Sequence, residues 1–172
     1  MTLAQRVRVI ACLGFGLLAA TAACAQSLPV QDQIIQHEQE LAEAGAARRV
    51  SDEGLELIIL GYLYRQAGAM QKALACRNEA LPIEQNADNR AAQAMTQNNM
   101  GRDYSNLEEA DKALEFDNQA LPIWREVQDR RGEALAQMTI GWAYSAREEK
   151  EKALASELTA LALARAAGDP EI

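Results

Sequence analysis

Small and apolar residues return at the same places along this chain at a constant spacing. The segment that begins at Gly101 reads GRDYSNLEEADKALEFDNQALPI, and related segments begin at Gly61 and Gly141. A fixed period between about 20 and 50 residues indicates a stacked array of structural repeats. The positions shared by all three segments are Gly61/Gly101/Gly141, Tyr64/Tyr104/Tyr144, Ala73/Ala113/Ala153, Leu74/Leu114/Leu154, Ala80/Ala120/Ala160 and Leu81/Leu121/Leu161.

The spacing inside one segment predicts a helical hairpin. Tyr104 follows Gly101 by three positions, and Ala113 follows Tyr104 by nine. This spacing is typical of two amphipathic helices joined by a turn, with small residues where the helices cross. One hairpin cannot bury its apolar side alone, so the copies must stack.

The chain therefore divides into three predicted repeats, near residues 50–88, 89–128 and 129–168. The first helices are expected near 51–66, 90–106 and 130–146, and the second helices near 70–85, 109–127 and 149–166. Residues 26–49 read as a linker and an N-terminal capping helix, because Ile34 and Leu41 precede Leu74 and Leu81 by one full period. No strand pattern is evident, and the predicted fold is an all-α solenoid.

The repeat resembles the tetratricopeptide repeat, whose signature fits Gly101, Tyr104, Ala113 and Ala120. The usual period of that family is about 34 residues. The longer period here is similar to the repeats of kinesin light chains and of bacterial arrays that precede caspase-like CHAT peptidase domains. The resemblance implies a concave groove that binds a protein or peptide and is lined by the first helices. The implied groove residues are Ile58, Tyr62, Arg65, Asn98, Arg102, Ser105, Met138, Trp142 and Ser145.

The chemistry of their side chains suggests roles for these residues, although the Lys and Asn pattern by which some family members bind a C-terminal carboxylate is not reproduced here. Arg65 and Arg102 would meet a carboxylate of the partner, and Asn98 would hold a peptide backbone. Tyr62 and Trp142 would anchor the partner, since amphipathic aromatic residues often do so at interfaces.

Two features depart from the family pattern. Arg77, Asp117 and Glu157 stand where the family places an aromatic or large apolar residue, which predicts an exposed position with Phe116 taking part of the packing. Pro82 and Pro122 fall inside the predicted second helices, where each should bend or interrupt the helix.

Composition and charge narrow the choice of partner. Apolar residues make up 49% of the chain and aromatic residues 5%, which suits helices packed through small side chains. The formal net charge of -8 argues against nucleic acid, because binding to a phosphate backbone depends on clustered Lys and Arg.

The first 25 residues have the form of a secretory signal peptide. Arg6 and Arg8 precede an apolar stretch, and Ala23-Cys24-Ala25 forms a cleavage site before Gln26. The sequence thus predicts an exported, periplasmic or extracellular bacterial protein without a membrane span after cleavage. An uncleaved anchor is the alternative, as is a lipoprotein modified at Cys24, although Thr21 stands where such signals usually have Leu.

The sequence offers little for catalysis. Cys76 is the one thiol of the mature chain and reads as a partly buried helix residue. His37 is the one histidine, and with no second His or Cys nearby it reads as a solvated side chain. Carboxylates such as Glu108 and Glu148 fall at helix starts, where they favour the helix dipole. We therefore expect no catalytic, cofactor-binding or metal-binding residue and no enzyme activity in this chain.

The sequence predicts an exported, non-catalytic scaffold for a protein or peptide partner. The alternative is the sensor or adaptor part of a larger enzyme, such as a CHAT-type peptidase, whose catalytic domain would lie downstream. Residues 167–172 align with the start of a further first helix, so the array reads as truncated at its C-terminal end. Self-association through the uncovered last helix is a further possibility.

Overall fold

The computed structural model describes residues 29–168. The predicted signal peptide, residues 1–25, and the end of the AGDPEI segment, residues 169–172, lie outside the described residues. Seven helices and no strand occur within the described range. The helices are α3 (Val30–Ala46), α4 (Val50–Gln66), α5 (Met70–Asn86), α6 (Arg90–Asn106), α7 (Ala110–Glu126), α8 (Arg130–Ala146) and α9 (Lys150–Ala167).

The helix bounds follow the predicted pattern closely. Helices α6 and α8 begin and end at the residues that the repeat predicts, and α7 and α9 differ by one residue at their ends. Helix α3 forms in the segment that precedes the first repeat. The all-α expectation is confirmed for the described part of the chain.

The loops between helices share one backbone geometry. A residue with positive φ recurs after every helix, at Arg48, Gly68, Asp88, Glu108, Gln128, Glu148 and Gly168. In each interhelix loop the next N–H donates to a carbonyl five positions earlier, as from Asn89 to Glu84 and from Glu109 to Tyr104, both at 2.9 Å. This is the bonding of a Schellman motif, which closes the C-terminal end of a helix. The local structure therefore repeats after every helix and the loop that follows it, which is half of the sequence repeat.

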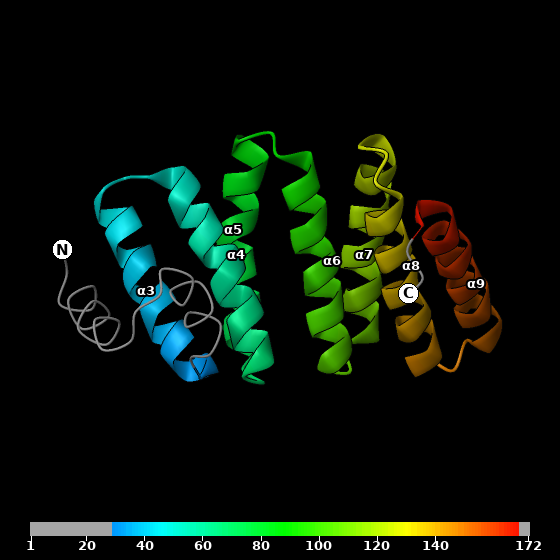
Figure 1. Cartoon of the computed structure of the whole chain (residues 1–172). Coiled ribbons are helices and arrows are strands. Elements are labelled where there is room, and N and C mark those ends of the chain that lie inside the picture. Colours follow the sequence, from blue (N-terminus) through cyan, green and yellow to red (C-terminus); the bar gives the residue numbers. More distant parts are fainter. Residues whose placement is uncertain (1–28, 169–172) are drawn as a thin grey trace, which may run out of the picture.

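The helices stand side by side in the order of the chain (Figure 1). Each helix from α3 to α9 packs against its neighbours in sequence, and α6 also packs against α8. The first helices of the repeats, α4, α6 and α8, thus lie on one side of the stack. We call this side the first-helix face. None of the helices in residues 29–168 combines the length and apolar character needed to cross a bilayer.

Two apolar clusters hold the stack together. One joins α3, α4 and α5 around Ile34, Leu60 and Tyr64, and the other joins α6, α7 and α8 around Leu114, Trp124 and Ile140. Close helix crossings depend on glycine. A Cβ atom added at Gly132 would overlap the Trp124 ring, so the indole of α7 packs directly on the backbone of α8.

The prolines of the second helices do not interrupt them. Helices α5 and α7 continue through Pro82 and Pro122, so of the expected bend or interruption the structure excludes the interruption. Each proline removes one backbone donor. Both prolines are exposed, where water can replace the lost hydrogen-bond partner.

Candidate functional site

The residues predicted for the groove lie on α4, α6 and α8 and differ widely in exposure. Tyr62 is 49% exposed and Trp142 is 42% exposed. Ser145 is also exposed, whereas Asn98 is buried. The remaining members are half-buried, namely Ile58, Arg65, Arg102, Ser105 and Met138. The first-helix face therefore presents two large aromatic side chains to solvent, one at each end of the array.

Two pockets lie between α6 and α8. The larger has a volume of about 270 Å³ and brings Asn98, Arg102 and Met138 together, with Trp124 in its wall. The smaller, of about 200 Å³, is lined by Ser105 and Trp142 among others. Ile58, Tyr62, Arg65 and Ser145 line neither pocket.

Each of these pockets has a wall residue with an unused polar atom. The indole nitrogen of Trp124 and the hydroxyl oxygen of Ser105 are buried and have no hydrogen-bond partner among residues 29–168. An unpaired buried donor costs free energy, about 1–3 kcal/mol, until something accepts its hydrogen bond. Both atoms could bond to a ligand or to ordered water.

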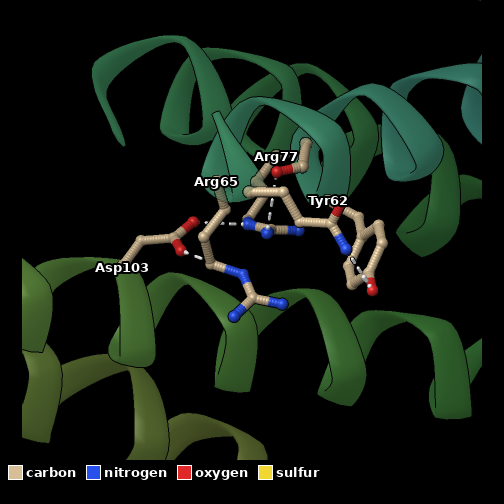
Figure 2. Close-up of polar contacts among 6 residues, drawn as sticks. Tyr62, Arg65, Arg77 and Asp103 are labelled. Atoms are coloured by element: carbon tan, nitrogen blue, oxygen red, sulfur yellow. Dashed lines mark hydrogen bonds and ion pairs between the residues drawn. The ribbon is translucent and has the colours of Figure 1, made fainter. Parts of the chain in front are cut away.

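A buried ion pair connects the first two repeats (Figure 2). The Nε atom of Arg77 in α5 donates to Oδ2 of Asp103 in α6 at 2.7 Å, and a terminal nitrogen of Arg77 donates to the carbonyl of Gly61 in α4 at 3.2 Å. Arg77 is 2% exposed and Asp103 is fully buried. Burial raises the pKa of the Asp103 carboxyl, and Arg77 opposes that rise.

Two further arginines lie near this ion pair. Arg65 Nε lies 3.8 Å from Asp103 Oδ1, and its guanidinium carbon lies 5.4 Å from the centre of the Tyr62 ring. Arg102 carries a pKa lowered by burial and, next, by the positive charge of Arg65. Arg77 and Arg65 thus lie within 4 Å of the Asp103 carboxylate, and Arg102 is near enough to interact electrostatically with all three groups. This cluster contains three positive groups and one negative group in a chain whose net charge is -8.

The structure corrects the prediction that Arg77, Asp117 and Glu157 are exposed. Glu157 is exposed, but Arg77 and Asp117 are buried. The reason is the helix that follows each of them, since α6 covers Arg77 and α8 covers Asp117, whereas no helix follows α9 within the described residues. A Cβ atom at Gly101 would lie 2.5 Å from Asp117, and one at Gly61 would lie 3.1 Å from Arg77, so each charged side chain occupies the space above a glycine. Phe116 is half-buried and stacks on Tyr104 with ring centres 5.4 Å apart.

Asp117 is held by neutral partners alone among the contacts of the described residues. Its Oδ1 accepts a hydrogen bond from Asn98 Nδ2 at 2.6 Å, and the same nitrogen donates to Thr139 Oγ1 of α8 at 3.0 Å. Burial raises the pKa of Asp117 to about 7, and the bonds from Asn98 and Thr139 oppose this. The amide nitrogen of Asn98, predicted to hold a peptide backbone, is therefore engaged inside the stack.

A third buried carboxyl links the first and second repeats. Thr96 Oγ1 of α6 donates to Glu84 Oε1 of α5 at 2.7 Å. Burial raises the pKa of Glu84, whereas Thr96 and Arg77 lower it. Sequence reasoning missed Glu84, Asp103 and Thr139, because the repeat register gives the position of a residue along its helix but not the partner it meets in the next repeat.

The structure places the thiol of Cys76 and the imidazole of His37, the two reactive groups considered in the sequence. Cys76 is buried, and burial raises the pKa of its thiol, which keeps it protonated and unreactive. His37 is 21% exposed and contacts Glu40 and Glu56, so the expectation of a solvated histidine is wrong.

A larger hollow of about 640 Å³ at the α6–α7 loop is lined by charged residues that pair with one another, as Arg147 does with Asp111.

Comparison with known proteins places the chain in a repeat family. The model of the tetratricopeptide repeat matches residues 55–126 and 92–166, which together span more than half of the chain. No curated protein sequence matches the chain.

Several solved structures share the fold at low sequence identity. BtubC (BKLC) from P. vanneervenii aligns with a TM-score of 0.74 and 20% identity, over 81% of this chain and 58% of that one. The apo form of RapI aligns with a TM-score of 0.73 and 18% identity, over 82% of this chain and 40% of that one. A Podosopora anserina protein described as a putative kinesin light chain with nearly identical TPR-like repeats aligns with a TM-score of 0.65 and 18% identity, over 80% of this chain and 68% of that one. The chain thus spans less than two thirds of the first two structures.

Proposed function

Because this chain belongs to the tetratricopeptide repeat family, we propose that it is a non-catalytic scaffold that binds a protein or peptide on its first-helix face. The observation that carries the proposal is the pocket of about 270 Å³ between α6 and α8, which Arg102 and Met138 line. Exposed Trp142 lies along the same helix pair, beside the second pocket.

The chemistry of the face favours a segment that carries both a carboxylate and an apolar side chain. Arg65 and Arg102 supply positive charge next to a single buried counter-ion, Asp103. A partner carboxylate could pair with the guanidinium groups, which bind carboxylates in a forked geometry. Tyr62 and Trp142 offer apolar surface with a polar edge, as binding hot spots commonly do.

The test is binding by variants matched on and off the face. Trp142→Ala and Arg102→Glu should each weaken capture of the partner, identified by mass spectrometry of material that co-purifies with residues 26–172. Ile35→Ala on α3 and Lys150→Glu on α9 make the same kinds of change at exposed positions away from this face and should leave capture unchanged. Circular dichroism checks that all variants stay helical. Equal capture by all four variants would exclude this face.

A photo-crosslinking amino acid locates the contact directly. Placed at Tyr62 or Trp142, it should attach to the partner, whereas the same group at Lys150 should not. Attachment from Lys150 alone would place the partner on α9 and contradict the proposal.

Export of the protein is part of the proposed function. It is supported by the charged, apolar and small-residue segments of residues 1–25. Mass spectrometry of the protein from a bacterial periplasm should find a mature chain that begins at Gln26. Lipid-modified Cys24 or an intact leader would favour the lipoprotein or the anchor instead.

The proposed function also includes self-association of the chain through the exposed side of α9. Leu154 is 57% exposed, whereas Leu74 and Leu114 at the same repeat position are each 8% exposed. Leu158, one turn further along α9, is 56% exposed. A second copy of the chain could cover this pair. Light scattering should then show a dimer that Leu154→Ser and Leu158→Ser dissociate, and a monomer at all concentrations would refute the idea.

A further inference from the structure

A histidine and two glutamates meet where α3 packs against α4. His37 Nδ1 lies 2.7 Å from Glu56 Oε2 and 3.3 Å from Glu40 Oε2. His37 and Glu40 stand three positions apart on α3, while Glu56 comes from α4. One ligand atom from each of the three residues lies within 4.8 Å of the others. The three groups therefore converge on one point from two helices.

We propose that His37, Glu40 and Glu56 bind one transition-metal ion of the Zn²⁺ class, with water in the remaining position. One imidazole nitrogen and two carboxylate oxygens are a donor set that suits Zn²⁺. Three protein ligands and a water complete the usual four-coordinate arrangement. To ligate the ion, Nδ1 of His37 must give up the proton that it shares with Glu56, and this proton is released to water while Nε2 keeps its own. The cluster then carries two negative charges, which a divalent cation would neutralise.

The geometry is close to that of an occupied site. Zn²⁺ bonds of about 2.0–2.2 Å in a tetrahedral arrangement place neighbouring ligand atoms about 3.4 Å apart. The His37–Glu40 separation of 3.3 Å is close to this value. The His37–Glu56 separation of 2.7 Å must increase, and a rotation of the Glu56 side chain is enough to increase it. No movement of either helix is required.

The surroundings orient the ligands. Gln36 Nε2 donates to Glu40 Oε1 at 2.7 Å, which leaves Oε2 of the same carboxylate facing His37. Such outer hydrogen bonds are typical of metal sites, since they fix the direction of each ligand. The side chains of His37 and Glu56 are 21% and 14% exposed, so an ion could enter while most of each ligand stays packed.

The bound ion would fasten α3 to the repeats. Glu56 belongs to the first helix of the first repeat, and α3 is the helix that precedes it. A ligand that binds the folded chain and not the unfolded one stabilises it in proportion to the logarithm of its concentration. The inferred role is therefore structural, a cross-link at the N-terminal side of the array, separate from the proposed partner-binding face.

The experiment is zinc titration of the full chain, purified without a polyhistidine tag and treated with a chelator. Isothermal titration should show one Zn²⁺ equivalent that is lost, or bound about 10-fold or more weakly, in His37→Ala and Glu56→Gln. Glu43→Gln removes a different, exposed carboxylate of α3 and should bind zinc as the parent chain does. Ca²⁺ and Mg²⁺ should not compete, because both prefer all-oxygen sites.

Two further readouts keep the proposal falsifiable if a variant folds poorly. Co²⁺ in place of Zn²⁺ should give visible absorption bands that Glu40→Gln weakens, and this variant retains the His37–Glu56 contact. The thermal midpoint of the parent chain should rise with added zinc and fall again with chelator. An unchanged midpoint together with no detectable zinc binding, or equal binding by His37→Ala and the parent chain, would leave only a histidine–glutamate ion pair and overturn the proposal.

Discussion

Arg77 of α5 and Asp103 of α6 form an ion pair across 2.7 Å at a place where neither side chain reaches solvent. The pair joins the second helix of the first repeat to the first helix of the second repeat. The net contribution of a buried ion pair to stability is small, because desolvation offsets much of the attraction, but loss of one partner is costly. Loss of either side chain should therefore weaken the packing of the first repeat against the second.

We predict that Asp103→Asn destabilises the fold by about 3–5 kcal/mol, because it leaves Arg77 buried without a counter-charge. Replacing both members, as Arg77→Met with Asp103→Leu, should cost less than the two single changes together. Urea unfolding followed by circular dichroism measures each free energy. Arg147→Met, at the exposed pair with Asp111, is the control and should have little effect. Strict additivity of the buried pair would contradict the prediction.

Asp117 should make stability depend on pH. Its pKa is raised from 3.8 to about 7 by burial, so the folded chain binds more protons than the unfolded chain between these values. Stability from this group is therefore present at low pH and is lost as pH rises through about 7. Relative to Asp117→Asn, the parent chain should lose on the order of 2–3 kcal/mol between about pH 5 and pH 8. Urea unfolding of both proteins across this range measures the difference, and a constant gap would contradict a raised pKa.

Two helical glycines should respond to alanine with opposite signs. Gly101 has the Asp117 carboxylate 2.5 Å from the place of a Cβ atom, so Gly101→Ala must displace a buried polar group and should destabilise by more than about 1 kcal/mol. Gly45 has nothing within 4 Å of that place. Gly45→Ala should stabilise by about 0.5–1 kcal/mol through helix propensity. Thermal midpoints give both signs, and equal shifts would show that packing at Gly101 is loose.

The positive φ angles in the loops between helices predict that a substitution to glycine there stabilises the fold. Gln128 has φ of 58° and an exposed side chain, so Gln128→Gly relieves the strain of a left-handed backbone. We expect a gain of up to about 1 kcal/mol. Ala75→Gly, at an exposed position inside α5, is the matched control and should lose about 1 kcal/mol. A loss at both sites would indicate that the Gln128 side chain stabilises the corner in another way.

The sequence predicted the helices well because their determinants are local. Gly61, Gly101 and Gly141 mark the same crossing in each repeat, and the turns between helices leave few choices for the helix ends. The constant period then implied stacking, which the tetratricopeptide repeat match and the structure confirm.

The polar contacts between repeats could not be predicted in the same way. Arg77 and Asp117 occupy one repeat position, but the first meets Asp103 and the second meets Asn98. A charged residue where the family has an apolar one predicts exposure, because the sequence does not show that a partner lies on another helix. The same limit applies to His37, since its partner Glu56 lies on α4. The groove residues remain a prediction that the binding experiments test.

The recurrence of one corner geometry after every helix bears on how such a gene can change its length. If one whole repeat is duplicated or deleted between equivalent positions, the two helices that become neighbours are still joined by a loop of the same backbone geometry. Polar contacts that occur between only one pair of repeats, such as Arg77 with Asp103, restrict such changes. A repeat placed next to a new neighbour would meet a different residue there. Recombination should therefore be tolerated most readily where neighbouring units meet through alanine and leucine alone.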